Sequence, residues 1–150
     1  QASLFSDAGE SSRLANRFVA EWRDAPGAGE VIVRDLGKEP ILDARAPARW
    51  RGEAEPIDPE AGRIPGSLNR FNSGNLTPEG VHKPAAQLRT EFEAVLAGRK
   101  ASEVVHSCGS GVTACHNLLA MEVAGLKGGK LYAGSWSEWI ADPQRPRERG

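Results

Sequence analysis

The sequence predicts one α/β domain with a mainly parallel sheet, and three observations lead to this prediction. Short apolar runs with β-forming residues alternate along the chain with amphipathic segments of helical period. The 150 residues are enough for one globular domain with a single core. Apolar residues make up 39% of the chain and charged residues 26%, as is usual for a globular protein.

Five short strands are expected, because each apolar run is bounded by polar or turn-forming residues. The runs cover residues 31–33, 40–43, 67–69, 103–107 and 130–132. Residues 52–66 contain three prolines and are expected to form an extended loop.

Helices are predicted between these strands. The first begins at Ser11 or Ser12, a second covers 46–50, a third runs from Pro84 to Leu96 and ends at Gly98, a fourth covers 112–123 before Gly125, and a last one starts within 134–139. The side chains expected to face inward are Leu14, Phe18, Val19 and Trp22 in the first helix, Leu88, Phe92, Val95 and Leu96 in the third, and Cys115, Leu118, Leu119 and Val123 in the fourth.

The predicted domain covers residues 11–142, between a loose leader at 1–10 and a loose tail at 143–150 that has two prolines and many charges. The net charge of -1 gives no support for a nucleic-acid or membrane partner. No apolar run approaches the roughly 20 residues that cross a bilayer. The first residues do not resemble a signal peptide, so we expect a cytoplasmic protein.

Cys108 and Cys115 are the two cysteines, too few for a disulfide scaffold in a chain of this size. With His106 and His116 nearby, they raise the question of a metal site. On a helix the two sulfur atoms would lie about two turns apart, roughly 10 Å, which is too far for one zinc ion. We therefore expect no metal.

Cys108 begins a tight turn between a predicted strand and a predicted helix, and the turn reads Cys-Gly-Ser-Gly-Val-Thr over 108–113. In open α/β sheets ligands bind beyond the carboxyl ends of the strands, where Cys108 falls. Gly109 and Gly111 let the turn curl until successive backbone N–H groups point into one concavity, and the next helix adds its positive end. A thiol there loses its proton easily, so we favour a nucleophilic Cys108 over a small buried apolar residue.

Five ordered blocks resemble the catalytic C-terminal half of the 3-mercaptopyruvate sulfurtransferases, which are relatives of rhodanese. Besides the turn, they are Leu-Asp-Ala-Arg at 42–45, Arg-Trp-Arg-Gly at 49–52, Ile-Pro-Gly-Ser-Leu-Asn at 64–69 and Gly-Ser-Trp-Ser-Glu-Trp at 134–139. The resemblance covers roughly residues 40–140 and implies a rhodanese-like three-layer fold, with about five mainly parallel strands flanked by helices.

The resemblance also implies a mechanism that needs no cofactor. Cys108 would take sulfur from a small donor as a persulfide and pass it to a thiol or cyanide. Arg49 would bind the donor's carboxylate, Ser110 would relay a proton or bind the substrate, and the loop residues Gly109, Ser110, Gly111, Val112 and Thr113 would hold the persulfide. Thiosulfate-preferring members carry cationic residues at the positions of Gly109 and Ser110, so this neutral loop favours 3-mercaptopyruvate.

The sequence departs from the family pattern at two positions. Ile57 falls where animal members have a second carboxylate-binding arginine, and Arg63 replaces a histidine. Because the family is normally a tandem of two such domains, an N-terminal rhodanese domain is an expected partner that this chain lacks.

For several nearby residues a structural role is a simpler explanation than a role in catalysis or binding. We prefer Asp43 and Arg45 as an ion pair that orders the site loop over a direct catalytic role. Trp136 and Trp139 are expected to pack, and Arg51 is equally well explained as a solvated neighbour of Arg49. His106 is expected to point away from the site or to pack, and the Thr113 hydroxyl to cap the helix.

Two other functions stay open. A dual-specificity phosphatase of this fold would need an arginine at the sixth position after the cysteine, where this chain has Ala114. A non-catalytic rhodanese-like module that binds a partner or senses redox state would usually lack the loop cysteine.

Overall fold

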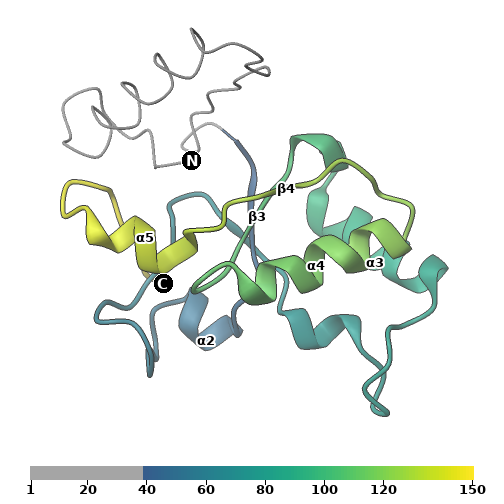
Figure 1. The fold of residues 1–150 in the computed structure, drawn as a ribbon, viewed down its shortest axis with the longest axis horizontal. Helices are drawn as coiled ribbons and strands as arrows, with labels where there is room; N and C mark the ends of the chain where they lie inside the picture. The colour runs from purple at the N-terminus through teal and green to yellow at the C-terminus, as the bar shows by residue number, and fades with distance from the viewer. Residues whose placement is uncertain (1–38) are drawn as a thin grey trace, which may run out of the picture. The chain divides into compact units, whose positions relative to one another are not determined.

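A computed structural model describes residues 39–150 of the chain, and its sheet has four parallel strands (Figure 1). They are β1 (Ile41–Asp43), β2 (Leu68–Asn69), β3 (Val105–Ser107) and β4 (Lys130–Leu131), in the order β2-β1-β3-β4. The predicted parallel α/β fold is therefore confirmed. The strand expected at 31–33, the helix from Ser11 or Ser12 and the leader at 1–10 lie outside the described residues.

The described helices follow the predicted positions closely. They are α2 (Pro47–Trp50), α3 (Ala85–Leu96), α4 (Val112–Val123) and α5 (Ser135–Ala141), with 3-10 turns η1 (Asn72–Asn75) and η2 (Ala101–Glu103). Helices α3 and α4 pack together on one side of the strands, and α5 lies on the other side (Figure 1). Within residues 39–150, no helix combines the length and apolar character that crossing a bilayer requires.

The register of the strands places the ends of β1 and β3 side by side. Asp43 pairs with Ser107 across β1 and β3, and with Asn69 across β1 and β2. Parallel strands present their carboxyl ends at one edge, where loops commonly carry binding groups. Cys108 directly follows β3, so it lies at this edge.

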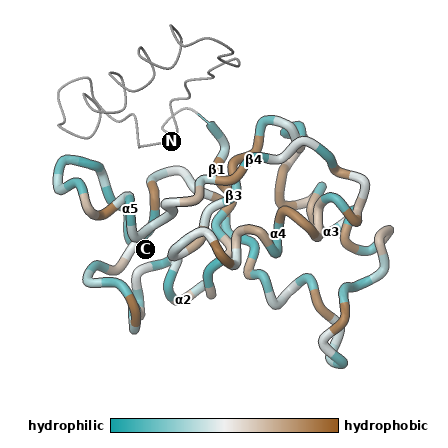
Figure 2. Tube along the Cα trace, viewed as in Figure 1, coloured by the Kyte–Doolittle hydropathy of each residue, from teal (hydrophilic) through white to brown (hydrophobic). Residues whose placement is uncertain are grey.

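The main core fills the space between the sheet, α3 and α4, where apolar segments gather in Figure 2. Its buried members are Leu42, Leu88, Phe92, Leu96, Val104, Ala120, Met121 and Ala124. Burying one large apolar side chain contributes roughly 1.5–3 kcal/mol, so each of the larger members of this cluster stabilises the fold by about that much. A smaller cluster of Ala44, Cys108 and Ala114 lies beneath the turn after β3.

The inward face predicted for α4 was wrong for three of its four members, and the fourth, Leu118, is half-buried. Leu119 and Val123 are 56% and 43% exposed, and Cys115 is also exposed. The helix instead buries Ala114, Asn117, Ala120 and Met121, and the two alanines let it approach β3 closely. Asn117 tolerates burial because it accepts a hydrogen bond from Asn75 at 2.7 Å and donates one to the carbonyl of Arg70 at 2.7 Å.

The end of α3 also differs slightly from the prediction. Ala97, with φ 49°, takes the left-handed position that closes the helix, one residue before Gly98. Val95 is only partly buried, at the margin of the core.

The C-terminal tail is packed, although a loose tail was expected. Glu148 pairs as an antiparallel bridge with Arg63, and the two side chains form an ion pair. The Trp139 indole donates to the carbonyl of Pro146 at 2.8 Å. Arg63, which stands where the family has histidine, also lies 4.2 Å over the Trp50 ring. Because the loop at 61–66 offers backbone groups and a cation, the charged tail has partners that its composition does not reveal.

His106 is fully buried in β3 and packs away from the site, in agreement with the prediction. Neither ring nitrogen has a hydrogen-bond partner among residues 39–150. Burial lowers the pKa of His106 from 6.5 to about 4, because the charged ring would lose its hydration.

This shift predicts that acid destabilises the fold through His106. Between pH 6.5 and 4 the unfolded chain takes up a proton that the folded chain does not, so stability falls as the pH falls. The full effect is about 3 kcal/mol. Denaturant unfolding should show His106→Leu losing less stability than the unmodified protein from pH 7 to 4.5. An equal pH dependence in both would contradict the prediction.

Candidate active site

Cys108 is 1% exposed, and its sulfur is surrounded by hydrogen-bond donors. The N–H of Gly111 donates to Sγ at 3.1 Å, and the backbone N–H groups of Ser110 and Ala114 and the Thr113 hydroxyl also donate to it. Gly111 makes this possible, since its φ of 85° turns the chain sharply into α4. The turn is therefore an anion-binding concavity centred on one sulfur atom.

These donors decide the protonation of the thiol. Burial alone would raise the pKa of Cys108, but the hydrogen bonds from Thr113, Ala114, Ser110 and Gly111 stabilise the thiolate and outweigh it. The pKa of Cys108 consequently lies below its ordinary value. A thiolate is the nucleophilic form of cysteine.

Thr113 does not cap α4, as the sequence suggested. Gly111 precedes the helix as its N-cap residue, there is no side-chain cap, and the Thr113 hydroxyl donates to the Cys108 sulfur instead. A capping hydroxyl accepts a backbone N–H, whereas here the Thr113 hydroxyl is a donor, and a charged sulfur is a strong acceptor for it.

We expect Thr113→Val to slow alkylation of Cys108 by iodoacetamide at neutral pH by roughly tenfold. A hydrogen bond to a charged group contributes about 1.5–3 kcal/mol, and losing it raises the pKa of the thiol. The rate of alkylation against pH measures this directly. Thr90→Val, which removes a hydroxyl bonded within α3, is the matched control and should leave the rate unchanged.

The start of α5 holds the Cys108 turn in place, a role that sequence reasoning missed. Ser135 Oγ accepts the N–H of Cys108 at 3.0 Å and donates to the carbonyl of Tyr132 at 2.8 Å. The N–H groups of Trp136 and Ser137 donate to the carbonyls of Cys108 and Gly109 at 3.0 and 2.8 Å. The block at 134–139 contained the signal, because it follows the neighbouring strand β4 and contains two serines.

Arg49 extends from α2 toward the same turn, where it is paired with two carboxylates. Its Nε and Nη2 donate to Glu55 at 2.6–3.1 Å, and Nη2 also donates to Asp58 at 3.1 Å. Burial opposes the charge on Glu55, but Arg49 and the N–H groups of Asp58 and Ile57 lower the pKa of that carboxyl. Glu55 and Asp58 were not predicted as site residues, since loop acids are usually solvated.

Asp43 and Arg45 form the expected ion pair beneath the site. The guanidinium of Arg45 donates hydrogen bonds from Nε and Nη2 to the Asp43 carboxylate at 2.8–3.2 Å, and both side chains are buried. Arg45 also donates to the carbonyl of Gly62 at 2.8 Å and to Glu55 at 3.4 Å. The pair thus anchors the loop that carries Glu55, in line with a supporting role. Arg51 pairs with Glu53 at the surface, and Trp136 and Trp139 are buried as expected.

A pocket of about 160 Å³ opens above the Cys108 sulfur. Of the residues predicted for the site, it is lined by Arg49, Cys108, Gly109, Ser110, Val112 and Thr113, and Gly111 contributes its N–H from behind. Asp58, Ser137 and Ile57 complete the wall. Ile57 and Val112 are 75% and 74% exposed, so the rim is apolar while the floor is polar.

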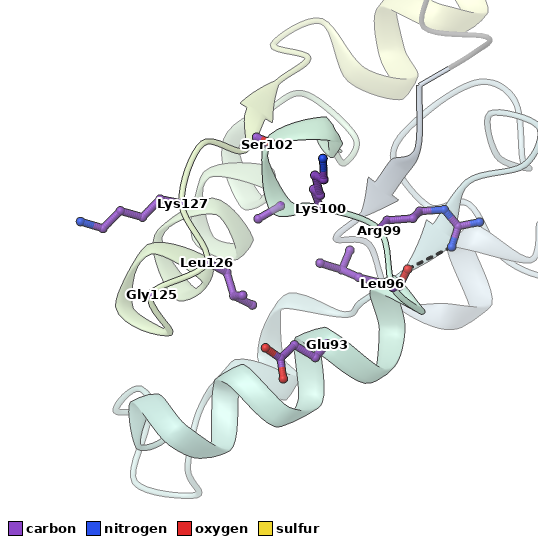
Figure 3. Close-up of a pocket in the computed structure, with 10 residues that line it drawn as sticks. Glu93, Leu96, Arg99, Lys100, Ser102, Gly125, Leu126 and Lys127 are labelled. Atoms are coloured by element: carbon purple, nitrogen blue, oxygen red, sulfur yellow. Dashed lines mark hydrogen bonds between the residues drawn. The ribbon is translucent and has the colours of Figure 1, made fainter.

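A larger pocket of about 580 Å³ lies at the opposite edge of the sheet, among the residues before β3 and the ends of α3 and α4 (Figure 3). Its wall contains Glu93, Arg99, Lys100 and Lys127 but no cysteine or histidine, and Lys127 points away from its centre. This pocket is the larger of the two. Of the two, however, only the Cys108 pocket contains a thiol whose charged form is stabilised, together with a cationic side chain, so we take it as the candidate active site. Residues 39–150 contain no cluster of three or more His, Cys, Asp or Glu side chains suited to a metal.

Comparison with known proteins identifies the family of this chain. Residues 28–142 match the rhodanese-like domain family. A probable 3-mercaptopyruvate sulfurtransferase from Pseudomonas aeruginosa is 56% identical over 110 residues, covering 73% of this chain and 39% of the relative. A putative thiosulfate sulfurtransferase, SseB, from Mycobacterium tuberculosis is 40% identical over 113 residues, covering 73% of this chain and 38% of the relative.

Among solved structures, the 3-mercaptopyruvate sulfurtransferase from Leishmania major superposes with a TM-score of 0.62 at 33% identity, covering 73% of this chain and 31% of that one. The chain spans about two fifths of the length of the curated relatives that it matches.

Proposed function

Because the chain belongs to the rhodanese-like domain family, we propose that it is a sulfurtransferase in which Cys108 carries the transferred sulfur as a persulfide. The names of its relatives support this activity, since they include 3-mercaptopyruvate and thiosulfate sulfurtransferases. Those relatives are longer than this chain, so the donor, the acceptor and any tandem domain are part of the proposal.

The observation that carries the proposal is the convergence of three N–H groups and one hydroxyl on the Cys108 sulfur. The same donors can hold a negatively charged outer sulfur, because the turn is open toward the pocket above it. A preorganised ring of donors stabilises the thiolate before transfer and the persulfide after it.

With 3-mercaptopyruvate, the Cys108 thiolate attacks the thiol sulfur of the donor. The new S–S bond forms as the C–S bond breaks, and its electron pair leaves on carbon as the enolate of pyruvate, which then takes up one proton. Ser110, exposed at the pocket, is the proposed relay for that proton. A thiolate or cyanide then attacks the outer sulfur and releases the Cys108 thiolate.

The charge of the loop favours 3-mercaptopyruvate over thiosulfate. Gly109 and Ser110 offer no cationic side chain to a dianion, and Arg49 is the one cation that lines the pocket among the described residues. Its planar guanidinium suits a single carboxylate.

The proposal is tested by mass spectrometry of the protein after treatment with 3-mercaptopyruvate. We expect a mass increase of about 32 Da, one sulfur atom, on the peptide that contains Cys108. Cyanide should remove the added mass and yield thiocyanate. If the folded protein gains no such mass with either 3-mercaptopyruvate or thiosulfate, the chain is a non-catalytic module and the proposal fails.

A further inference from the structure

Charges of alternating sign lead from the buried ion pair beneath the site to the wall of the Cys108 pocket, which Arg49 and Asp58 line. Asp43 pairs with Arg45, Arg45 contacts Glu55, and Glu55 pairs with Arg49. Asp58, the last of these groups, forms an ion pair with Arg49 through Nη2. Three carboxylates therefore face two guanidinium groups, so the network carries an excess of one negative charge, and its last carboxylate, Asp58, lines the pocket itself.

Asp58 is held firmly in this position. Its side chain is only 6% exposed, Oδ2 accepts from Arg49 at 3.1 Å, and Oδ1 accepts from the Ser137 hydroxyl at 2.6 Å. Ser137 is tied to the Cys108 turn, since its N–H donates to the carbonyl of Gly109. The backbone of Gly109 closes over the pair, because a side chain there would lie 3.5 Å from Arg49 Nη2 and 3.7 Å from Asp58 Oδ2.

We propose that Asp58 determines donor specificity: it occupies, on Arg49, the position that an anionic donor needs, and it discriminates against dianions. This inference rests on the proposed sulfurtransferase function and identifies a selecting residue within that site. A donor carboxylate must take Nη2 from Asp58 or bind beside it, and in both cases it approaches a fixed negative charge.

The size of the penalty depends on the charge of the donor. Coulomb energy scales with the product of the charges, so a dianion such as thiosulfate meets about twice the repulsion that a monoanion such as 3-mercaptopyruvate meets. Within a buried wall this repulsion is poorly screened by salt. Asp58 thereby adds a second source of selectivity to the neutral loop at Gly109 and Ser110.

The experiment compares Asp58→Asn with the unmodified protein on both donors. Asparagine has nearly the same shape and can still accept the Ser137 hydroxyl. We expect the KM for 3-mercaptopyruvate to fall about threefold and that for thiosulfate about tenfold, because removing one charge acts twice as strongly on a dianion. Glu53→Gln removes a carboxylate from the same loop, at the surface and outside the pocket, and should change neither KM.

Equal changes for the two donors, or a higher KM for both, would show that Asp58 only positions Arg49 and would overturn the proposal. If Asp58→Asn does not fold, Asp58→Ser provides the test, since it also removes the negative charge. It should lower the KM for thiosulfate more than the KM for 3-mercaptopyruvate, and an unchanged or higher thiosulfate KM would refute the inference.

A second measurement needs no sulfur transfer. Inorganic sulfate should protect Cys108 from iodoacetamide, and its Kd should be about tenfold lower in Asp58→Asn than in the unmodified protein. An unchanged sulfate Kd contradicts the role of Asp58. If the sulfate result holds while no persulfide forms, the proposed function fails and the anion selectivity of Asp58 stands.

Discussion

Cys108→Ser is expected to abolish persulfide formation and to lower sulfur transfer at least about 10³-fold. A serine hydroxyl in the same ring of donors stays protonated near neutral pH, because its pKa is far higher than that of a thiol. An oxygen atom also cannot form the S–S bond that stores the sulfur. Mass spectrometry and the release of thiocyanate measure the two losses separately.

Cys115→Ser is the matched control for this variant. Cys115 is exposed on the outer face of α4, and its Sγ lies 3.4 Å from the carbonyl oxygen of Gly111. Its replacement should leave both measurements within twofold of the unmodified protein. If Cys115→Ser removed the added sulfur while Cys108→Ser kept it, the assignment of the nucleophile would be wrong.

Gly111→Ala is expected to damage both the fold and the site. A Cβ at Gly111 would lie 2.4 Å from the carbonyl oxygen of Ala133, and the backbone φ of 85° is unfavourable for alanine. Left-handed strain costs about 1–3 kcal/mol, and overpacking costs about 1–3 kcal/mol more. Any shift that relieves the contact also moves the N–H that donates to Sγ, so persulfide formation should fall about 100-fold or more.

Gly80→Ala separates the cost of left-handed backbone strain from the cost of overpacking. Gly80 has a similar φ of 79°, but nothing lies within 4 Å of a Cβ placed there. This variant should lose only the strain energy in denaturant unfolding and should form persulfide at the normal rate. A normal rate in folded Gly111→Ala would show that the turn geometry is not needed for catalysis.

The sequence alone predicted the elements that depend on local chemistry. The strand, turn and helix around Cys108 were predictable because apolar runs, paired glycines and helical period act over a few residues. The same holds for α2 and for α3, where Pro84 stands at the start of the helix. The Asp43–Arg45 pair was also predictable, because its members are neighbours in the chain.

Other features depended on which segments meet in space. Helix α4 was predicted to bury Leu119 and Val123, but its packing against β3 places two alanines, Asn117 and Met121 on the inner face. The tail was expected to be loose, and it is held by Arg63, which lies 85 residues away from Glu148. Hydrophobic period identifies a helix, but it does not identify the neighbour that the helix contacts.

The proposed nucleophile, its turn and Arg49 could thus be predicted from the sequence, because each belongs to a short ordered block. Only the tertiary structure revealed that Ser135 accepts the N–H of Cys108, and that Thr113 donates to the Cys108 sulfur. The ion pairs of Arg49 with Glu55 and Asp58 were likewise seen only there. The Ser135 contact joins the loops that follow β4 and β3, whereas the other contacts lie within one turn or loop. All of them depend on distances and burial that hydrophobic period and turn residues do not encode.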